Sequence, residues 1–515
     1  MKHAENYILT SEQAREVDRQ SIQEFGIPSL VLMERAALAL AEVIRHDSAG
    51  REQPRILVAA GVGNNGADGL AAARILQGFG YEHISVVAVG NSEKATEEWM
   101  SQYYILIALG IPVVFWNQLD KGEYTGIRDS DLIIDALFGI GLKRDISGDY
   151  ADVIRSINES PAKKYAADIP SGICASTGKV MGCAVKADVT VTFGLEKVGM
   201  VLYPGAEYAG RIVCRDIGFP KQAVEAAAPT FFTYTKEALK HLPDRPAYSN
   251  KGTFGKVLII AGSPNMAGAA YLASKAAYAA GCGLVKILTD ERNRTILQTL
   301  IPEAIMTTYS PEHPAEKMID EALKWADALV LGPGISTSAT AERMVRFVLH
   351  SSQVPMVIDA DALNILAKHP DWWRERTAPA VATPHLGELG RLSGKPVEEL
   401  KKNLVEEILL MQKELGVVLA AKDARTIVAG NEKMIYINTS GNSGMAKAGS
   451  GDVLTGIIAA LLARKQSPMQ AACLGVYLHG LAGDTARQLH GEYGMKASDL
   501  TEGLAEVLRQ YSAQK

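Results

Sequence analysis

The sequence predicts a two-domain α/β protein, in which each domain is built on a mostly parallel sheet covered by helices on both faces. Its 515 residues exceed what one hydrophobic core organises, so at least two domains are expected. Short apolar segments alternate with helix-like segments in two separate series, as they do in open parallel sheets. Between the two series, residues 218–253 are rich in Pro, Ala and charged residues. We therefore expect an N-terminal domain over residues 1–222 and a C-terminal domain over residues 223–515.

The first series follows a helix-like opening that covers residues 10–20 and 30–45 and should pack on the outside of the sheet. Its strand-like segments are apolar or β-branched and are separated by lengths suited to crossover helices. They are residues 55–61, 83–90, 111–115, 131–139, 164–170 and 188–194.

The second series has the same alternation but no obvious sequence similarity to the first. Its strand-like segments are residues 256–263, 283–289, 326–334, 355–364, 378–385, 417–423 and 426–430. An apolar run that starts after Gly451 predicts a further helix, because it is longer than most buried strands.

Composition argues against several classes of function. The net charge is −5, no basic run is present and aromatic residues make up only 6%, so a nucleic-acid partner is not expected. The longest apolar stretches fall short of the roughly 18–20 residues that a membrane span needs, and the first residues do not resemble a signal peptide. The five cysteines show no Cys-x-x-Cys spacing. Together these features predict a soluble, cytoplasmic protein with reduced thiols and no membrane partner.

The most informative motif lies in residues 442–463, where a Gly- and Ser-rich turn leads directly into an apolar helix. Backbone N–H groups at a helix start are unsatisfied and partly positive, so this turn predicts a phosphate site. Asp452 falls in the first helical turn, where a carboxylate can take the proton of a substrate hydroxyl that attacks a phosphoryl group. A plain turn with a helix cap would give the same short pattern, so the motif needs support from elsewhere.

That support comes from polar or small residues at the ends of other predicted strands in the same half. They are Gly262–Gly268, Gly332–Gly334, Asp359, Asp361, His385, Glu388, Lys422 and Thr426. Taken singly, each could be a cap, a loop residue or a solvated charge. Because open parallel sheets collect ligands at the carboxyl ends of their strands, we expect these residues to converge on one site.

In this order and spacing the motifs resemble the ribokinase-like superfamily and, within it, the ADP/ATP-dependent NAD(P)H-hydrate dehydratases. The resemblance covers residues 223–515 and implies a ribokinase-like fold that uses Mg²⁺ and ADP or ATP. It places the nucleotide at Lys422, Asp423, Ala424, Arg425, Thr426 and Gly451. It places the hydrated nicotinamide nucleotide at Ala269, Gly334, His385 and Asp452, with Glu388 near Mg²⁺ and the phosphates.

Two residues depart from the family pattern. Asp423 stands where glycine usually follows the lysine, and Ala448 stands where glycine is frequent. Asp423 adds a negative charge close to the expected phosphate site.

The implied reaction suits a kinase-like site. Hydrated NADH or NADPH carries a hydroxyl at C6 of the reduced ring, and hydroxide is a poor leaving group. Phosphorylation converts the hydroxyl into a good leaving group, which the ring nitrogen then expels. Asp452, as the catalytic base, needs only to deprotonate the hydroxyl.

The N-terminal half has its own strand-end loop, GVGNNGADG, over residues 61–69. Gly61, Gly63 and Gly66 match the GxGxxG dinucleotide fingerprint, which is weak evidence alone. The acidic residue that the fingerprint requires after the next strand is missing, since that strand ends in Gly90 and Asn91. Hydride transfer is therefore disfavoured, while the amides and carboxylate of the loop could hold a cation and a phosphate.

This loop, with the later segments DALFGIG and ADIPSG, resembles the NAD(P)H-hydrate epimerase domain, which implies a Rossmann-like three-layer fold over residues 1–222. By that resemblance Asp168 is the catalytic acid/base, and Asn65, Asp135 and Ser171 hold a K⁺ ion. The substrate would bind Asn64, Asn65, Gly66, Ala67, Asp68, Gly139, Ile140, Gly141, Leu142, Lys143, Arg144, Asp145 and Asp168. Ala67 replaces a glycine of the usual pattern, and MERAA near Met33 replaces the common MENAG.

The combined prediction is a bifunctional metabolite-repair enzyme that epimerises hydrated NADH and NADPH at C6 and dehydrates the S epimer. A homo-oligomer is implied by the resemblance alone. Two alternatives stay open: a ribokinase-like kinase for a small molecule such as a vitamin precursor, and an N-terminal domain that only binds or acts as a scaffold. Neither a P-loop nor a zinc-ligand spacing is present in the sequence.

Overall fold

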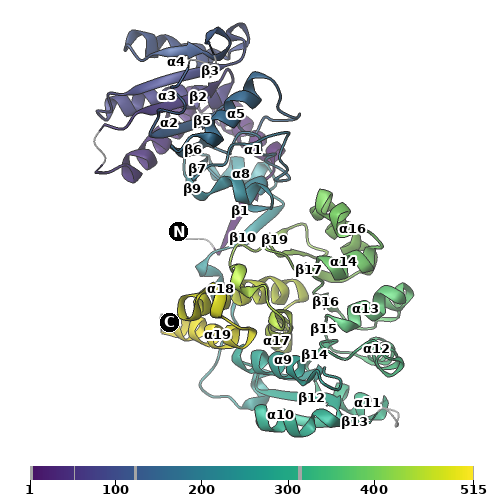
Figure 1. Cartoon of the computed structure of the whole chain (residues 1–515). Coiled ribbons are helices and arrows are strands. Elements are labelled where there is room, and N and C mark those ends of the chain that lie inside the picture. Colours follow the sequence, from purple (N-terminus) through teal and green to yellow (C-terminus); the bar gives the residue numbers. More distant parts are fainter. Residues whose placement is uncertain (1–3, 51–52, 121–123, 311–315, 514–515) are drawn as a thin grey trace. The chain divides into compact units, whose positions relative to one another are not determined.

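The computed structural model describes residues 4–50, 53–120, 124–310 and 316–513 and divides into two compact units (Figure 1). The N-terminal unit is Tyr7–Phe231. The C-terminal unit begins at Phe232 and also includes the stretch of chain that ends at Asn6.

The expected boundary between residues 222 and 223 falls inside helix α8 (Lys221–Ala226), so the structure differs from the sequence prediction here. Residues after this helix still belong to the N-terminal unit, because Gln13 Nε2 donates hydrogen bonds to the Ala228 carbonyl and to Thr230 Oγ1. Ala227 is also buried in one apolar cluster with Val17.

The N-terminal sheet has seven strands, all parallel, in the order β4-β3-β2-β5-β6-β7-β9. Their bounds are β2 (Ile56–Gly61), β3 (Ile84–Val89), β4 (Val113–Phe115), β5 (Leu132–Ala136), β6 (Lys163–Ala167), β7 (Val189–Phe193) and β9 (Arg211–Arg215). A short parallel pair lies outside this sheet, formed by β1 (Glu5–Leu9) and β8 (Glu196–Lys197).

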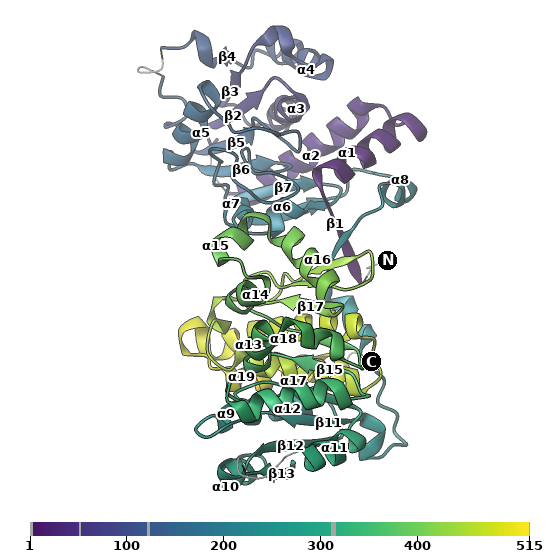
Figure 2. The same ribbon diagram turned by 90° about the vertical axis from the view of Figure 1, so that its right-hand side faces the viewer.

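Alternate residues of the N-terminal strands face two helical layers, as expected for a sheet buried on both sides. Val58 and Ala60 of β2 belong to the cluster that helices α2, α3 and α4 cover, whereas Leu57 and Ala59 belong to the cluster that α5 covers. Figure 2 shows α5 and the α2–α3 pair on opposite sides of this sheet. The helices of this unit are α1 (Ser11–Arg19), α2 (Ser29–Asp47), α3 (Asn64–Gly78), α4 (Glu97–Ala108), α5 (Asp149–Glu159), α6 (Val198–Val201), α7 (Gly205–Ala209) and α8.

The C-terminal sheet follows the same rule on a larger scale. Its order is β13-β12-β11-β14-β15-β16-β17-β18-β19-β10, with parallel pairing from β13 to β17 and antiparallel pairing from β17 to β19. The bounds are β10 (Phe231–Tyr234), β11 (Lys256–Ile260), β12 (Leu284–Asp290), β13 (Ile305–Tyr309), β14 (Ala328–Leu331), β15 (Met356–Ile358), β16 (Ala380–Ala382), β17 (Val418–Ala421), β18 (Ile427–Ala429) and β19 (Ile435–Ile437).

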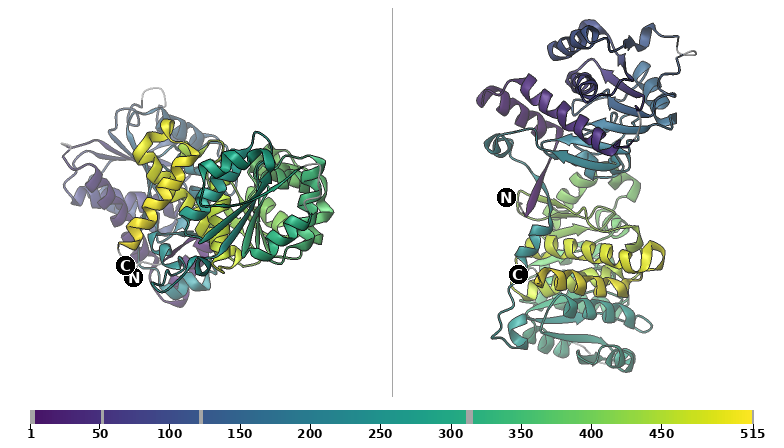
Figure 3. Two further views of the ribbon diagram at one scale, coloured as in Figure 1. Left: turned by 90° about the horizontal axis from the view of Figure 1, so that it is seen from below. Right: turned by 90° about the vertical axis from the view of Figure 1, so that its left-hand side faces the viewer.

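Helices cover both faces of this sheet as well. Figures 1 and 3 show α9 and α17–α19 on one face and α12–α14 on the other. Val257 and Ile259 of β11 pack in the first of these layers together with Ile457 of α17. The helices are α9 (Ala267–Ala279), α10 (Arg294–Leu300), α11 (Glu316–Trp325), α12 (Ala339–Ser351), α13 (Asp361–Lys368), α14 (Leu386–Ser393), α15 (Val397–Leu400), α16 (Leu404–Leu415), α17 (Ser450–Ala463), α18 (Pro468–Gly494) and α19 (Ala497–Ser512).

Each sheet has one point at which the chain reverses the direction in which it adds strands. That point lies between β2 and β5 in the N-terminal unit and between β11 and β14 in the C-terminal unit. Ligands of open α/β sheets bind outside the carboxyl ends of the strands at this point. The topology therefore indicates one candidate site in each unit.

The expected α/β class with two parallel-sheet domains is confirmed. None of the helices in the described ranges is long and apolar enough to cross a membrane. All five cysteines lie in described parts of the chain, and none of them forms a disulfide there.

Candidate active sites

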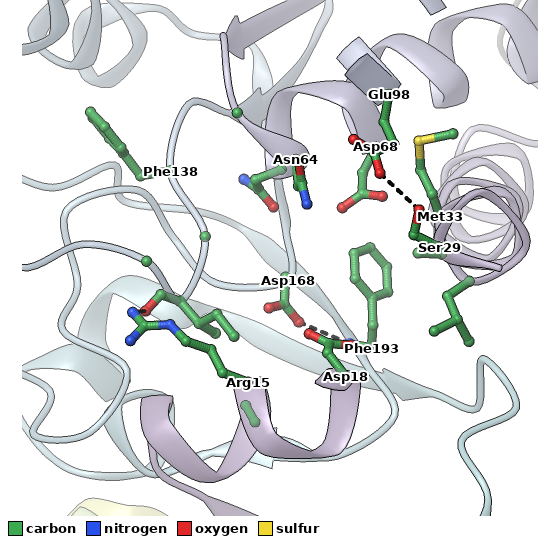
Figure 4. A pocket seen from close by; sticks show the side chains of 18 of the residues that line it. Arg15, Asp18, Ser29, Met33, Asn64, Asp68, Glu98, Phe138, Asp168 and Phe193 are labelled. Carbon is green, nitrogen blue, oxygen red and sulfur yellow. Dashed lines mark hydrogen bonds between the residues drawn. The ribbon is translucent and has the colours of Figure 1, made fainter. Parts of the chain in front are cut away.

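A cavity of about 570 Å³ lies at the reversal point of the N-terminal sheet (Figure 4). Its wall is formed largely by the loops that follow β2, β5 and β6 and by helices α1 and α2. The predicted substrate residues that line it are Asn64, Asn65, Asp68, Gly139, Ile140, Gly141, Leu142 and Asp168. Sequence reasoning thus located the loops that meet at this cavity.

The remaining predicted residues of this site lie off the cavity wall. Gly66 and Ala67 are buried in the first turn of α3. Lys143, Arg144 and Asp145 continue the loop after Leu142 as an exposed stretch. They are not among the described residues that line the cavity, because the chain turns away from the wall after Leu142.

Two of the three fingerprint glycines are required by packing. A Cβ on Gly66 would lie 1.8 Å from the Gly61 carbonyl oxygen, and a Cβ on Gly61 would lie 2.1 Å from the Leu137 carbonyl oxygen. Gly63 has open space at the same position and precedes α3 without a capping side chain. The free N–H groups of the first turn of α3 therefore face the cavity and can bind an anion.

Asp168 follows β6 and is held in the cavity by the structure around it. Its φ of 68° is unusual for a non-glycine residue. Its Oδ1 accepts hydrogen bonds from Thr192 Oγ1 at 3.1 Å, the Phe193 N–H at 3.1 Å and Lys197 Nζ at 2.5 Å. With these bonds made, the second carboxylate oxygen stays available to a ligand.

Two of the predicted K⁺ ligands, Asp135 and Ser171, form a fully buried pair, while the third, Asn65, lines the cavity. Ser171 donates its hydroxyl to Asp135 Oδ1 at 2.5 Å and its backbone N–H to Oδ2 at 2.8 Å. Burial raises the pKa of Asp135 to about 6, although the Ser171 bonds oppose the shift. The Asn65 side chain lies against Gly139, and its buried Nδ2 has no hydrogen-bond partner among the described residues. The oxygens of Asp135, Ser171 and the Asn65 amide are hard ligands of the kind that K⁺ takes, whereas the unpaired Asn65 Nδ2 needs a hydrogen-bond acceptor rather than a cation.

Sequence reasoning missed four charged residues that line the cavity, Arg15, Asp18, Glu98 and Lys197. Asp18 lies on α1, where an acidic residue of an amphipathic helix looks like an ordinary solvated charge. Lys197 lies just after β7, so the rule that polar residues gather at strand ends could have found it.

In the C-terminal unit the predicted residues gather at the carboxyl ends of β15, β16 and β17. Lys422 Nζ lies 2.7 Å from Asp359 Oδ1 and 4.0 Å from Glu388 Oε2. Gly451 lets this pair approach helix α17, because a Cβ there would lie 3.0 Å from Lys422 Nζ. The predicted phosphate loop and the lysine therefore meet.

His385 and Glu388 are joined at the start of α14. His385 Nδ1 accepts the N–H groups of Gly387 at 3.0 Å and Glu388 at 3.3 Å, while the His385 N–H donates to Glu388 Oε2 at 2.8 Å. Burial and the nearby Lys422 lower the pKa of His385, so its ring is neutral with the proton on Nε2. Burial raises the pKa of Glu388.

Asp452 is in the first turn of α17, whose N-cap Gly449 has a φ of 89° and offers no capping side chain. The start of α17 is thus open to an anion. Burial and then the negative charge of Asp359 raise the pKa of Asp452 to about 7, although Lys422 opposes the shift. A carboxylate of this kind can accept a proton near neutral pH.

Two of the four predicted nicotinamide-side residues, Ala269 and Gly334, follow the strands β11 and β14 at the reversal point of the sheet. A Cβ on Gly334 would lie 3.1 Å from the Ala269 Cβ, so these two residues are neighbours. The loops that carry them are joined, since the Ser263 N–H donates to the Gly334 carbonyl at 2.6 Å. Ser336 in turn donates its N–H to Asp361 Oδ2 at 2.9 Å.

Lys422 to Thr426 form the turn between the antiparallel strands β17 and β18. Asp423 and Ala424 are exposed in this turn, and Arg425 Nη1 donates to the Thr439 carbonyl at 3.1 Å. Because Asp423 is exposed, solvent screens its additional negative charge.

His479 of α18 contacts Ser450 at the start of α17, next to the phosphate loop. Its Nε2 lies 3.0 Å from the Ser450 carbonyl and 3.3 Å from Ser450 Oγ. Burial lowers the pKa of His479 to about 4, so the ring is neutral and can donate to that carbonyl. This residue was not predicted from the sequence.

Both parts of the chain are similar to known proteins. Family models match the chain at residues 257–506 (NAD(P)H-hydrate dehydratase) and at residues 29–199 (YjeF-related protein N-terminus). A crystal structure of ADP/ATP-dependent NAD(P)H-hydrate dehydratase from Bacillus subtilis, co-crystallised with ATP/Mg²⁺, has 31% sequence identity and a TM-score of 0.47. The match covers 54% of this chain and 97% of that chain.

Full-length relatives share both parts. The bifunctional NAD(P)H-hydrate repair enzyme Nnr of Moorella thermoacetica is 39% identical, over 98% of this chain and 97% of the relative. The enzyme of the same name from Escherichia coli is 33% identical, over 97% of this chain and 93% of the relative. The chain therefore belongs to the family of bifunctional NAD(P)H-hydrate repair enzymes.

Proposed function

We propose that the C-terminal site dehydrates the S epimer of hydrated NADH or NADPH at the expense of ADP or ATP, and that the N-terminal cavity interconverts the R and S epimers at C6. The observation that carries the dehydratase assignment is the position of Asp452. It combines a carboxylate poised to accept a proton near neutral pH with an uncapped helix start next to Lys422.

The dehydration follows from these groups. Asp452 takes the proton of the C6 hydroxyl as its oxygen attacks the terminal phosphorus of the nucleotide. The nucleotide leaves one phosphate shorter. The C6–O bond then breaks with the ring nitrogen supplying electrons, orthophosphate leaves, and loss of a proton from C5 restores the dihydronicotinamide.

The binding roles follow the same geometry. The nucleotide is assigned to Lys422–Thr426 and Gly451, and its phosphates to the start of α17. The nicotinamide nucleotide is assigned to Ala269, Gly334 and His385. Lys422 is the positively charged side chain that contacts the phosphate site at the start of α17.

The carboxyl groups around Lys422 fit a divalent cation. The negative charges of Asp359, Asp361 and Glu388 raise the pKa of Asp452, that of Asp359 also raises the pKa of Glu388, and Lys422 opposes both shifts. Mg²⁺ binds through a few carboxylates together with substrate phosphates, so Glu388 and Asp359 would hold it here. When bound, it neutralises the charge that develops on the transferred phosphoryl group.

In the N-terminal cavity, Asp168 is assigned as the acid/base for epimerisation. The substrate is assigned to the loops Asn64–Asp68 and Gly139–Asp145, of which Asn64, Asn65, Asp68 and Gly139 to Leu142 line the cavity. A substrate phosphate is assigned to the uncapped start of α3. Asn65, Asp135 and Ser171 would hold K⁺, which neutralises the buried Asp135 carboxylate. No oxidant or reductant is needed for this reaction.

The proposal also covers the cellular location, the assembly and the partners of the protein. Five cysteines without a disulfide support a reducing, cytoplasmic environment. The homo-oligomer and the absence of nucleic-acid and membrane partners stay predictions. The rival small-molecule kinase would share the start of α17, but it would release a stable phosphorylated product.

The test is recovery of the near-ultraviolet absorbance of the reduced nicotinamide from a mixture of R and S hydrated NADH, with Mg²⁺, K⁺ and ADP or ATP. Full recovery that requires nucleotide, with release of orthophosphate, is the expected result. If the S epimer is not consumed with either nucleotide, the dehydratase proposal is wrong. A phosphorylated product without recovered absorbance would favour the kinase.

A further inference from the structure

Three aspartates and one lysine gather around the N-terminal cavity. Asp18 comes from α1, Asp68 from α3, Asp168 from the loop after β6 and Lys197 from β8. Figure 4 shows Asp18 next to Asp168, with Asp68 on the α3 side of the same space. Among the described residues, neither Asp18 nor Asp68 has a hydrogen-bond or ion-pair partner.

Lys197 forms an ion pair with Asp168, one of the three carboxyl groups. Lys197 is only 3% exposed. Its Nζ donates hydrogen bonds to Asp168 Oδ1, to Thr192 Oγ1 at 2.9 Å and to the Phe193 carbonyl at 3.0 Å. Three acceptors hold the Lys197 Nζ in a fixed position. Asp168 is therefore the carboxylate whose negative charge is neutralised.

Asp68 has the opposite environment. Burial, followed by the negative charges of Asp168 and Asp18, raises the pKa of Asp68 well above its usual range. Burial and Asp168 raise the pKa of Asp18 to about 6. Of the three carboxyl groups, Asp68 thus favours the protonated form most, Asp18 favours it less, and Asp168 has Lys197 as its counter-ion.

The other titratable groups around the cavity are engaged elsewhere. Arg15 donates to the Ile140 carbonyl, Glu98 accepts from Ser29, Tyr150 donates to the Val89 carbonyl, and Cys214, which faces Lys197, donates to the Gly194 carbonyl. None of these groups competes for the proton on Asp68.

We propose that Asp68 is the acid and Asp168 the base of the epimerisation, and that Lys197 is the positioning residue that makes these two carboxyl groups unequal. The inference rests on the proposed epimerase function and assigns to Asp68 a proton-transfer role in place of substrate contact alone.

With these roles, each proton that is removed during the reaction is also returned. Asp168 takes the proton of the C6 hydroxyl, the C6–O electrons form a carbonyl, and the bond between C6 and the ring nitrogen breaks. The electron pair of that bond passes to the nitrogen, which takes the proton of Asp68. Rotation about the C5–C6 bond presents the other carbonyl face, and the same steps in reverse close the ring. Both carboxyl groups then regain their starting states.

The experiment measures kcat and KM for conversion of the pure R epimer across about pH 5 to 9, a range centred on neutral pH, where acid–base catalysts operate. The variants are Asp68→Asn, Lys197→Met, Lys197→Arg and Asp18→Asn. Lys163→Met is the matched control, since it removes another lysine–aspartate pair of the same unit (Lys163–Asp47, 3.1 Å) outside the cavity lining. Repair of the S epimer by the same sample checks the C-terminal unit, and circular dichroism checks the fold.

Asp68→Asn is expected to lower kcat by about 10²–10⁴-fold and to abolish the loss of rate at alkaline pH, because an amide cannot give up a proton. Lys197→Met should move the acidic limb of the profile to higher pH, since Asp168 loses its counter-charge, and should lower kcat more than it raises KM. Lys197→Arg should restore the position of that limb. Lys163→Met should stay within about threefold of the parent, a margin below the effect of a lost proton-transfer group. Asp18→Asn removes a negative charge that raises the pKa of Asp68, so it should move the alkaline limb to lower pH without the loss of kcat seen in Asp68→Asn.

An unchanged acidic limb in folded Lys197→Met, or an alkaline limb retained in Asp68→Asn, would overturn the inference. So would a loss of rate in Asp18→Asn that equals the loss in Asp68→Asn. If Lys197→Met does not fold, Thr192→Val replaces it, because Thr192 bonds both Lys197 and Asp168 and its loss should shift the limb in the same direction. A parent enzyme that converts the R epimer no faster than buffer would instead refute the proposed epimerase function itself.

Discussion

At the scale of single residues, the two candidate sites use aspartates whose surroundings differ. Asp168 is paired with the buried Lys197, whereas Asp452 is crowded by Asp359 and shares Lys422 with it. A paired carboxylate stays ionised, and a crowded, buried one holds its proton up to higher pH. The same residue type is thereby suited to different proton-transfer tasks in one chain.

The environment of Asp452 predicts the pH dependence of the dehydratase. The base must be ionised, and burial raises its pKa to about 7, so kcat/KM for the S epimer should fall as the pH drops below about 7 and level off above it. Asp359→Asn removes the negative neighbour and should shift this limb to lower pH. Initial rates of absorbance recovery at fixed nucleotide test both points, and a profile that is flat from about pH 6 to 8 would contradict the assignment.

The residues that could be predicted from the sequence are those that directly follow a strand. Asp168, His385 and Lys422 were found because polar residues after apolar runs are conspicuous. Asp18 could not be found, because only the tertiary fold turns its helix face toward the cavity. Lys197 could have been found by the same rule that located the others, since it lies just after β7.

At the scale of elements, the start of α3 depends on close approach of backbone to backbone. The first turn of the helix lies against the end of β2, where Gly66 and Gly61 leave no room for a side chain. Gly63, between them, lies at the open end of the same turn. The motif thus contains two glycines needed for packing and one that leaves the helix start accessible.

A pair of alanine substitutions tests this distinction. Gly66→Ala places a Cβ 1.8 Å from the Gly61 carbonyl oxygen and should destabilise the N-terminal unit by about 1–3 kcal/mol or more, as overpacking does. Gly63→Ala meets no atom within 4 Å and should keep the fold, so it serves as the control. Thermal unfolding and R-epimer conversion report on the N-terminal unit, while S-epimer repair should be unaffected. Equal stability of the two variants would show that the close approach is not needed.

The alternation of strands and helices was sufficient to predict most of both sheets. The strands that escaped prediction are short or partly polar, such as β9, which is exposed along much of its length, and β19, which has three residues. β10 lies in the segment interpreted as a linker. Such strands are specified by pairing with a neighbour rather than by their own hydrophobic pattern.

At the scale of the whole molecule, two catalytic sites on one chain should be separable by single substitutions. Asp168→Asn should leave repair of the S epimer unchanged and reduce recovery from the R epimer to the uncatalysed rate. Asp452→Asn should abolish recovery from both epimers and leave their interconversion intact. Chromatography of the two epimers, alongside absorbance, measures both activities, and joint loss from either variant would mean that the sites depend on each other.

The C-terminal unit is discontinuous, because it includes the stretch that ends at Asn6 as well as the chain from Phe232 onward. The Thr235 N–H donates a hydrogen bond to the Ala4 carbonyl at 3.0 Å within this unit. The ribosome therefore synthesises the first piece of the C-terminal unit, then all of Tyr7–Phe231, and only then the rest of the C-terminal unit. Domains generally fold as they are synthesised. The N-terminal unit can therefore fold before the chain from Phe232 onward has been made, and the first piece can pack into the C-terminal unit only after that. Expression of the C-terminal unit alone from Phe232 would omit this piece, so a separately produced dehydratase should carry residues 1–6 joined to it by a linker.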